Sequence, residues 1–142
     1  MSPARERILE EARSWLGTPF HNCASVKGAG VDCVHFMKAV YAACGVIEDF
    51  TIDQYAPQWF LHKDEPLFLN GLARYADRIE KAAALPADAI MYNLGRHAAH
   101  CAIIVDERTI IHAYSRARCV TLSDRGALEG REDSFWRVRG LA

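Results

Sequence analysis

The feature that most constrains the fold of this chain is a change of hydrophobic pattern near Pro86. Before this residue, apolar side chains recur at the spacing of amphipathic helices. After it come short runs rich in β-forming residues, with too few residues between them for crossover helices, so neighbouring strands should be antiparallel. The order predicts an α+β fold in which N-terminal helices pack on a C-terminal antiparallel sheet.

Capping and turn residues predict where the elements begin and end. Ser2 and Pro3 open the first helical pattern, Asp32 caps the second directly before Cys33, and Gly45 ends it. We expect helices over residues 3–16, 33–44 and 64–75, and a glycine-rich loop over 17–31. We expect strands over residues 89–92, 100–105, 109–114, 118–122 and 134–139.

Length and charge limit the classes of function. With 142 residues, 51% of them hydrophobic, the chain can bury a sizeable core, and we expect one domain over residues 1–142. Its 17 basic and 18 acidic side chains leave a net charge of −1, so it has no basic field for nucleic acid or an anionic membrane. The charged N-terminus has no apolar stretch like that of a signal peptide or spanning helix. We expect a soluble protein made in the cytoplasm.

One of the five cysteines is best placed to react. Cys33 follows the run Gly30-Val31-Asp32 at a predicted helix start, where unpaired backbone N–H groups and the helix dipole stabilise a thiolate. The same N–H groups could bind the oxyanion formed when the sulfur attacks a carbonyl. The sequence therefore predicts Cys33 as a nucleophile.

The other four cysteines are given packing roles by default. They are Cys23, Cys44, Cys101 and Cys119. The set is odd in number and contains no CxxC pair, which argues against a disulfide framework and a zinc ribbon.

A cysteine nucleophile needs a base, and six histidines compete for this role. On the predicted helix His35 lies about 200° around from the thiol and points away from it, and His62 lies in a charged stretch typical of a surface. His100 and His112 differ because each begins or ends a strand of one predicted hairpin, which can bring them together. We predict His100 as the base and His112 as its orienting partner, with His97 as the main alternative base.

The pairing of these two histidines depends on the length of one turn. If Val105 pairs with Thr109 across the three-residue loop 106–108, His100 and His112 lie on one face of the sheet as diagonal neighbours. A two-residue loop would put them on opposite faces unless a bulge intervened. The proposed site therefore requires the longer loop.

Zinc is an alternative occupant of the same site, because thiolate and imidazole are its preferred ligands. The candidate ligands would be Cys33, His97, His100 and His112. Their spacing is not that of a known zinc motif, and a glycine-rich loop before a helix start is better explained by acyl chemistry. We therefore expect neither a metal nor a cofactor.

Several runs of residues resemble the NlpC/P60 cell-wall peptidases. They are Leu16-Gly17-Thr18-Pro19-Phe20, Gly28-Ala29-Gly30-Val31-Asp32-Cys33, His100-Cys101-Ala102-Ile103-Ile104 and Ile111-His112-Ala113. The resemblance spans nearly the whole chain, with a looser match over residues 46–80. Residues 24–28 are most similar to the branch encoded in phage tail and gene transfer agent clusters.

The resemblance implies a papain-like fold, with the cysteine on a helix and both histidines on the sheet. By this analogy Cys33 is the nucleophile, His100 the general base and acid, and His112 the third polar residue. Phe20 and Asp32 would join Cys33 in the oxyanion and substrate site. The family typically cleaves peptidoglycan stem peptides, often between γ-D-glutamyl and a diamino acid. Phage-like tail tip or baseplate proteins are the expected partners, and the periplasm or cell wall the expected place of action.

The chain departs from the family pattern at several positions. Phe20 stands where the family usually has a tyrosine whose hydroxyl faces the reaction centre. Val34 and His35 replace a Ser-Gly pair after the nucleophile, and Ala87 and Ala102 replace glycines. A catalytically weak or inactive structural tail protein of the same fold is therefore one alternative. An intracellular amidase or acyltransferase on a non-wall substrate is another.

Overall fold

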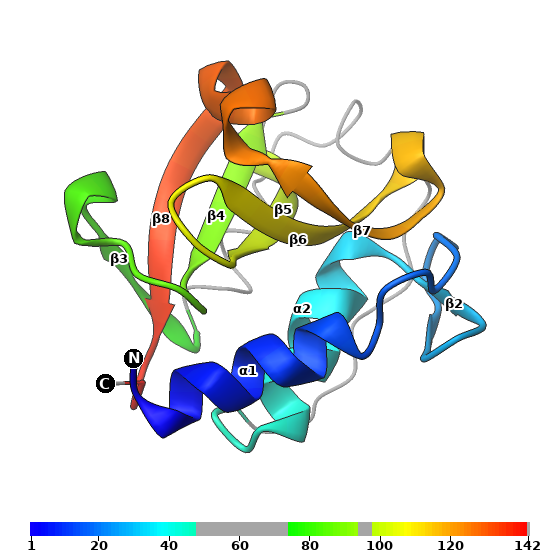
Figure 1. Ribbon diagram of the computed structural model, residues 1–142, viewed down its shortest axis with the longest axis horizontal. Helices are drawn as coiled ribbons and strands as arrows, with labels where there is room; N and C mark the ends of the chain where they lie inside the picture. Colours follow the sequence, from blue (N-terminus) through cyan, green and yellow to red (C-terminus); the bar gives the residue numbers. More distant parts are fainter. Residues whose placement is uncertain (48–73, 94–97, 142) are drawn as a thin grey trace.

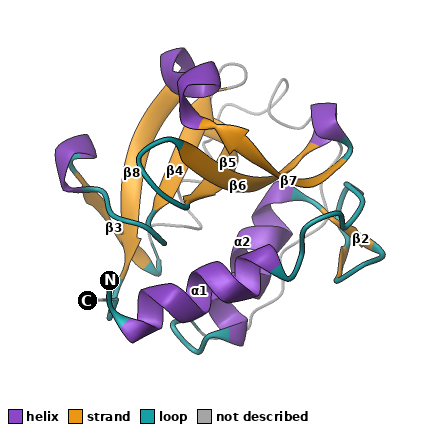
Figure 2. Ribbon diagram, viewed as in Figure 1, coloured by secondary structure: helices purple, strands orange, loops and turns teal. Residues whose placement is uncertain are grey.

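The computed structural model of the chain describes residues 1–47, 74–93 and 98–141. Two helices, α1 (Pro3–Arg13) and α2 (Cys33–Ala43), pack against a six-stranded antiparallel sheet (Figure 1). Figure 2 shows α1 and α2 on one side of the sheet, while short helical segments lie at the ends of the strands. This arrangement confirms the predicted α+β fold. Of the helices in the described ranges, none is long and apolar enough to cross a membrane.

The sheet has the strand order β3-β8-β4-β5-β6-β7. Its strands are β3 (Ala76–Ile79), β4 (Ala89–Asn93), β5 (Ala98–Ile104), β6 (Thr109–Tyr114), β7 (Cys119–Asp124) and β8 (Glu132–Val138). Three 3-10 turns join them, namely η1 (Lys81–Ala83), η2 (Ser115–Ala117) and η3 (Arg125–Arg131). The predicted strands are all present. The sequence missed β3 because Asp77 and Arg78 are both exposed, which leaves no apolar alternation.

Helix α1 ends earlier than the predicted boundary at residue 16. Ser2 caps its start, but the helix stops at Arg13 with Ser14 as the C-cap. Trp15 still reaches the core, because a turn follows in which its N–H donates to the carbonyl of Ala12. Apolar spacing thus continued beyond the helix itself, and the predicted end was wrong by three residues.

The glycine-rich segment after α1 is more ordered than the loop predicted for residues 17–31. It contains a small hairpin of β1 (Ser25–Val26) and β2 (Gly30–Val31), whose turn uses a positive φ at Gly28. Phe20 pairs with Val31 beside it. The third predicted helix lies outside the described residues over 64–73, and residues 74–75 form a turn.

The strand β5 is buried on both faces. Cys101 and Ile103 belong to the core that includes both helices, whereas Ala102 and Ile104 belong to a second apolar cluster on the opposite face. Fully burying a side chain of this size typically contributes about 1.5–3 kcal/mol. A strand held from both sides gives a rigid support for the polar residue His100 near its start.

At Ala87, where the family usually has glycine, the backbone keeps a conformation that glycine favours. Its φ is +80°, and its carbonyl accepts a 2.8 Å hydrogen bond from the Tyr41 hydroxyl. The adjacent carboxylate of Asp88 is fully buried and accepts from Arg5 at 3.1 Å and from Arg137 at 2.8 Å. These contacts join α1, α2 and β8 to the turn that precedes β4.

Candidate active site

Cys33 is the first residue of α2, as the sequence predicted. The Asp32 carboxylate caps the helix by accepting a 2.9 Å hydrogen bond from the His35 N–H. The thiol is nearly covered, since Cys33 is 8% exposed. The backbone N–H groups of a first helical turn lack partners within the helix and carry its positive dipole end. They are therefore suited to bind the oxyanion that forms on a substrate carbonyl when the sulfur attacks its carbon.

The β5–β6 hairpin brings His100 and His112 together. Its register pairs Ile103 with Ile111, and the Val105 N–H donates to the Thr109 carbonyl at 2.9 Å. The loop therefore has the three residues that the proposed site requires, and the two-residue alternative is excluded. Nε2 of His100 lies 2.8 Å from Nδ1 of His112, so one proton is shared between the rings. Because Nε2 is engaged in this way, Nδ1 of His100 is the nitrogen left to meet the thiol.

The environment of Cys33 favours its thiolate. A hydrogen bond from Cys101 lowers the pKa of Cys33, and hydrogen bonding to His100 and its charge act in the same direction. Burial and the charge of Asp32 oppose them, and the resulting pKa is about 6 instead of 9.0. The sulfur is therefore mostly ionised at neutral pH.

Cys101 takes part in the site, although its sequence position suggested only packing. Its buried Sγ lies 3.3 Å from the Cys33 carbonyl oxygen, so its one proton points to that oxygen or, once Cys33 is ionised, to the Cys33 sulfur. Cys33 and burial raise the pKa of Cys101 well above its ordinary value, so this thiol keeps its proton and can donate it to an anion. The sequence carried no signal for this role, because strand alternation places Cys101 on the opposite face of β5 from His100, among the core residues that pack on the helices.

His112 is held neutral and is bonded on both ring nitrogens. Burial, followed by the charge of His100, lowers the pKa of His112 to about 3. Its Nε2 lies 2.8 Å from Oγ of Ser123 on β7. The ring of Tyr114 stacks on it at 4.6 Å. No signal in the sequence pointed to Ser123, which meets His112 only through the β6–β7 pairing. Tyr114 lies two residues from His112 on the same strand, and its part in the site was not recognised.

Aromatic rings flank the base as well. Tyr92 and Tyr114 lie 5.9 Å and 5.4 Å from the ring centre of His100. Tyr92 is completely buried, and burial raises its pKa. These rings leave the imidazole little freedom to turn, which keeps it aligned between the thiol and His112.

The groups around Asp32 position the helix start. The His35 imidazole lies with Nδ1 2.9 Å from Oδ1 of Asp32, so this histidine is directed to the cap, in keeping with the prediction that it points away from the thiol. Oδ2 accepts a 2.7 Å hydrogen bond from the Cys23 N–H. Asp32 thus joins the preceding loop to α2. The Asp32 carboxylate has no proton to donate to an oxyanion. An oxyanion at the start of α2 would therefore be bound by backbone N–H groups.

The remaining predicted residues lie around this centre or outside the described chain. Phe20 is half-buried against the core, and its N–H donates to the Arg118 carbonyl at 2.8 Å. Cys44 is half-buried and packs on the same core, and Cys23 and Cys119 are also half-buried. The alternative base His97 and the surface candidate His62 lie outside the described residues.

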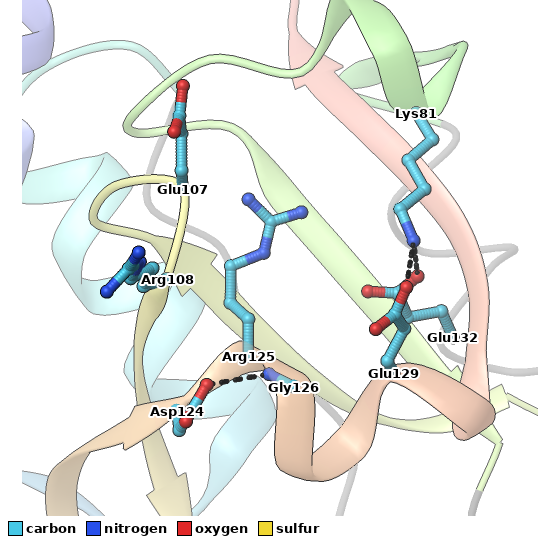
Figure 3. Close-up of a pocket in the computed structure, with 8 residues that line it drawn as sticks. All are labelled: Lys81, Glu107, Arg108, Asp124, Arg125, Gly126, Glu129 and Glu132. Atoms are coloured by element: carbon cyan, nitrogen blue, oxygen red, sulfur yellow. Dashed lines mark hydrogen bonds and ion pairs between the residues drawn. The ribbon is translucent and has the colours of Figure 1, made fainter.

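A cavity of about 400 Å³ lies apart from these residues, between η1, the β5–β6 turn and η3. Figure 3 shows Lys81 directed at Glu129 and Glu132, with Arg125 nearby. The predicted site residues are not among those lining it. Within the described ranges, no cluster of His, Cys, Asp or Glu suits a metal ion; the zinc set of the sequence analysis includes His97, outside them.

Comparison with known proteins gives a family match over most of the chain. The model of the NlpC/P60 family matches residues 17–131, a span that includes the thiol, both histidines and Ser123. No curated protein matches the chain.

Solved structures share the fold at low identity. An NLP/P60 family protein from Staphylococcus aureus has 17% identity and a TM-score of 0.68, and the match covers 97% of this chain and 42% of that one. The NlpC/p60 domain of the peptidoglycan hydrolase SagA has 18% identity and a TM-score of 0.64, over 94% and 98% of the chains. RipD from Mycobacterium tuberculosis, described as a non-catalytic NlpC/p60 domain protein, has 14% identity and a TM-score of 0.64, over 99% and 100%. The chain thus spans less than half of the staphylococcal protein.

Proposed function

The chain belongs to the NlpC/P60 family, and on that premise we propose that it is a cysteine hydrolase of amide bonds in peptidoglycan stem peptides. The observation that carries the proposal is the chain of hydrogen bonds that runs from Cys33 to His100 and from His100 to His112. A thiol with a pKa of about 6 meets a histidine whose far nitrogen is held 2.8 Å from a second ring. Nucleophile, base and orienting group are the parts that acyl transfer needs.

The reaction would proceed in two halves. The Cys33 thiolate attacks the carbonyl carbon, and the N–H groups at the start of α2 bind the oxyanion. The C–N bond then breaks, and His100 gives its proton to the departing amine, which leaves a thioester on Cys33. In the second half, water attacks the thioester while His100 removes its proton. The acid product departs, and the thiolate and the protonated imidazole are restored.

Substrate and setting follow from the resemblance of the motifs. The expected bond joins γ-D-glutamyl to a diamino acid. Residues 24–28 resemble the phage tail and gene transfer agent branch, so we propose a role at the tip of a phage-like particle that opens the wall locally. Its partners would be tail tip or baseplate proteins, and its place of action the periplasm or cell wall.

Digestion of purified peptidoglycan tests the proposal directly. We expect the wild-type chain to release peptides that mass spectrometry identifies, and Cys33→Ala and His100→Ala to release none. Both variants should keep the far-ultraviolet circular dichroism spectrum of the parent. Equal release by Cys33→Ala would rule out this cysteine as the nucleophile.

A non-catalytic role is the second candidate. It is supported by the fold similarity to RipD, which is described as a non-catalytic protein, and by Phe20 in place of the family's usual tyrosine. In that case peptidoglycan would bind without cleavage, and particle infectivity would be the same with Cys33→Ala. An amidase acting on a non-wall substrate would instead retain thiolate reactivity at Cys33 while leaving the wall intact.

A further inference from the structure

The hydrogen-bonded path from Cys33 does not end at His112, and we propose that Ser123 is a positioning residue for the reactive pair. Ser123 lies on β7 across from Ile110, and its Oγ is 2.8 Å from Nε2 of His112. The path therefore runs from Cys33 through His100 and His112 to Ser123. The inference rests on the proposed function only in that Cys33 and His100 form the reactive pair.

The role of Ser123 follows from the protons that the path must carry. Once His100 has taken the thiol proton it is an imidazolium, and both of its nitrogens donate. Its Nε2–H then points at Nδ1 of His112, which must accept. His112 is neutral, because burial and the charge of His100 lower its pKa to about 3. A neutral ring that accepts at Nδ1 carries its own proton on Nε2, and the Ser123 hydroxyl is placed to accept that proton.

Removing this acceptor would favour the wrong tautomer of His112. The Nε2–H would be left as a buried donor without its partner, which is unfavourable. The other tautomer moves the proton to Nδ1, where it faces the Nε2–H of a protonated His100. Two N–H groups would then face each other, so the protonated form of His100 would be destabilised. The thiolate of Cys33 would lose the positive charge that stabilises it.

Neighbouring groups do not provide the same contact. Thr121 lies directly across from His112 on β7, but its hydroxyl donates to the Leu122 carbonyl at 3.2 Å. Tyr114 stacks on the ring face of His112 and so packs against it. The titratable groups that act on the thiol from α2 and β5 are Cys101, His100 and Asp32. Of these, His100 is the one bonded to His112.

The pH profile of Cys33 alkylation by iodoacetamide tests the inference, read by mass spectrometry on the peptide that contains Cys33. We expect Ser123→Ala to shift the midpoint upward and to slow alkylation near pH 6 about tenfold, the effect of one hydrogen bond. Ser123→Thr keeps a hydroxyl and should restore the profile. Thr121→Ala, the matched control, should not change it. A wild-type midpoint in Ser123→Ala, or a Ser123→Thr variant as impaired as Ser123→Ala, would overturn the proposal.

A measurement on the unmodified protein covers the case in which the alanine variant does not fold. In protein labelled with ¹⁵N-histidine, the ring nitrogen shifts of His112 should report a neutral Nε2–H tautomer. An Nδ1–H tautomer would overturn the proposal. Neither assay uses a wall substrate. A shifted midpoint in Ser123→Ala beside a wild-type chain that releases no wall peptides would therefore reject the proposed function alone. Normal digestion with an unshifted midpoint would reject the role of Ser123 alone.

Discussion

The start of α2 and the β5–β6 hairpin both act on the Cys33 thiol, and their charged groups act in opposite directions. On the helix side, the Asp32 carboxylate raises the pKa of the thiol. On the hairpin side, Cys101 and then His100 lower it. The local motif therefore places the sulfur, and the distant hairpin makes it an anion.

This division explains why an acidic residue can precede the nucleophile. Asp32 accepts hydrogen bonds from the His35 N–H, the His35 ring and the Cys23 N–H, so part of its charge is neutralised by donors. The same bonds tie the loop to the helix. The cost is an unfavourable charge beside the thiolate, and the hairpin offsets it.

Removing the base should have the largest effect on this balance. His100→Ala is expected to raise the midpoint of Cys33 alkylation from about 6 towards 9.0. Reactivity at neutral pH should fall by more than about tenfold, because both the hydrogen bond and the charge of His100 are lost while the Cys101 hydrogen bond remains. Iodoacetamide kinetics at Cys33 measure this, with His21→Ala, at an exposed histidine, as the control. An unchanged profile in His100→Ala would mean that the hairpin does not ionise the sulfur.

Acid should destabilise the fold through the second imidazole. The pKa of His112 is about 3 in the folded protein and 6.5 ordinarily, so between these values the unfolded chain binds a proton that the folded one excludes. Stability should therefore fall as the pH drops, by about 2 kcal/mol between about pH 6.5 and about pH 4. Urea denaturation at several pH values measures the slope. His112→Gln should flatten it, whereas an equal slope in that variant would place the titrating group elsewhere.

Replacing Cys101 separates the thiol donor from the base. Cys101→Ala removes the first cause of the lowered pKa, so the Cys33 midpoint should rise. Alkylation near the original midpoint should slow by about tenfold, roughly one hydrogen bond. Cys101→Ser keeps a donor of similar size and should restore most of the rate. If serine and alanine gave the same profile, hydrogen bonding by this side chain would not matter.

The smallest effect, of opposite sign, is expected on the helix side. Asp32→Asn removes the opposing charge but keeps a capping oxygen, so the Cys33 midpoint should move below 6. The rate at mildly acidic pH should rise a few-fold, and the free energy of unfolding should fall by about 1 kcal/mol as charged hydrogen bonds weaken. Asp124→Asn is the matched control, since Asp124 caps η3 away from the thiol. A raised midpoint in Asp32→Asn would mean that the Asp32 carboxylate does not oppose the thiolate.

The sequence predicted the helix side of the site better than the sheet side. Asp32 and Gly45 are local signals, and α2 begins and ends where they indicate. The register of the hairpin was left between two loop lengths, and the structure has the one that the pair of histidines requires.

What escaped prediction depends on strands that are distant in the chain. Ser123 meets His112 only through the β6–β7 pairing, and a serine in an alternating strand carries no local signal. Cys101 was given a packing role because a buried cysteine usually serves only to fill the core. The prediction of one domain over residues 1–142 and the roles assigned to Phe20 and His97 stay predictions.

The loop 106–108 has a consequence for how this surface can vary. Surface loops usually accept insertions and deletions, because their length affects little beyond themselves. Here β5 is held by β4, and β6 by β7, so neither strand can slide to absorb a change. Deleting one residue of the loop would either force a β-bulge or turn one imidazole to the other face of the sheet. The apolar pattern of the sequence would not reveal this change. The number of residues in this exposed turn, more than their identity, therefore decides whether the two imidazoles face each other.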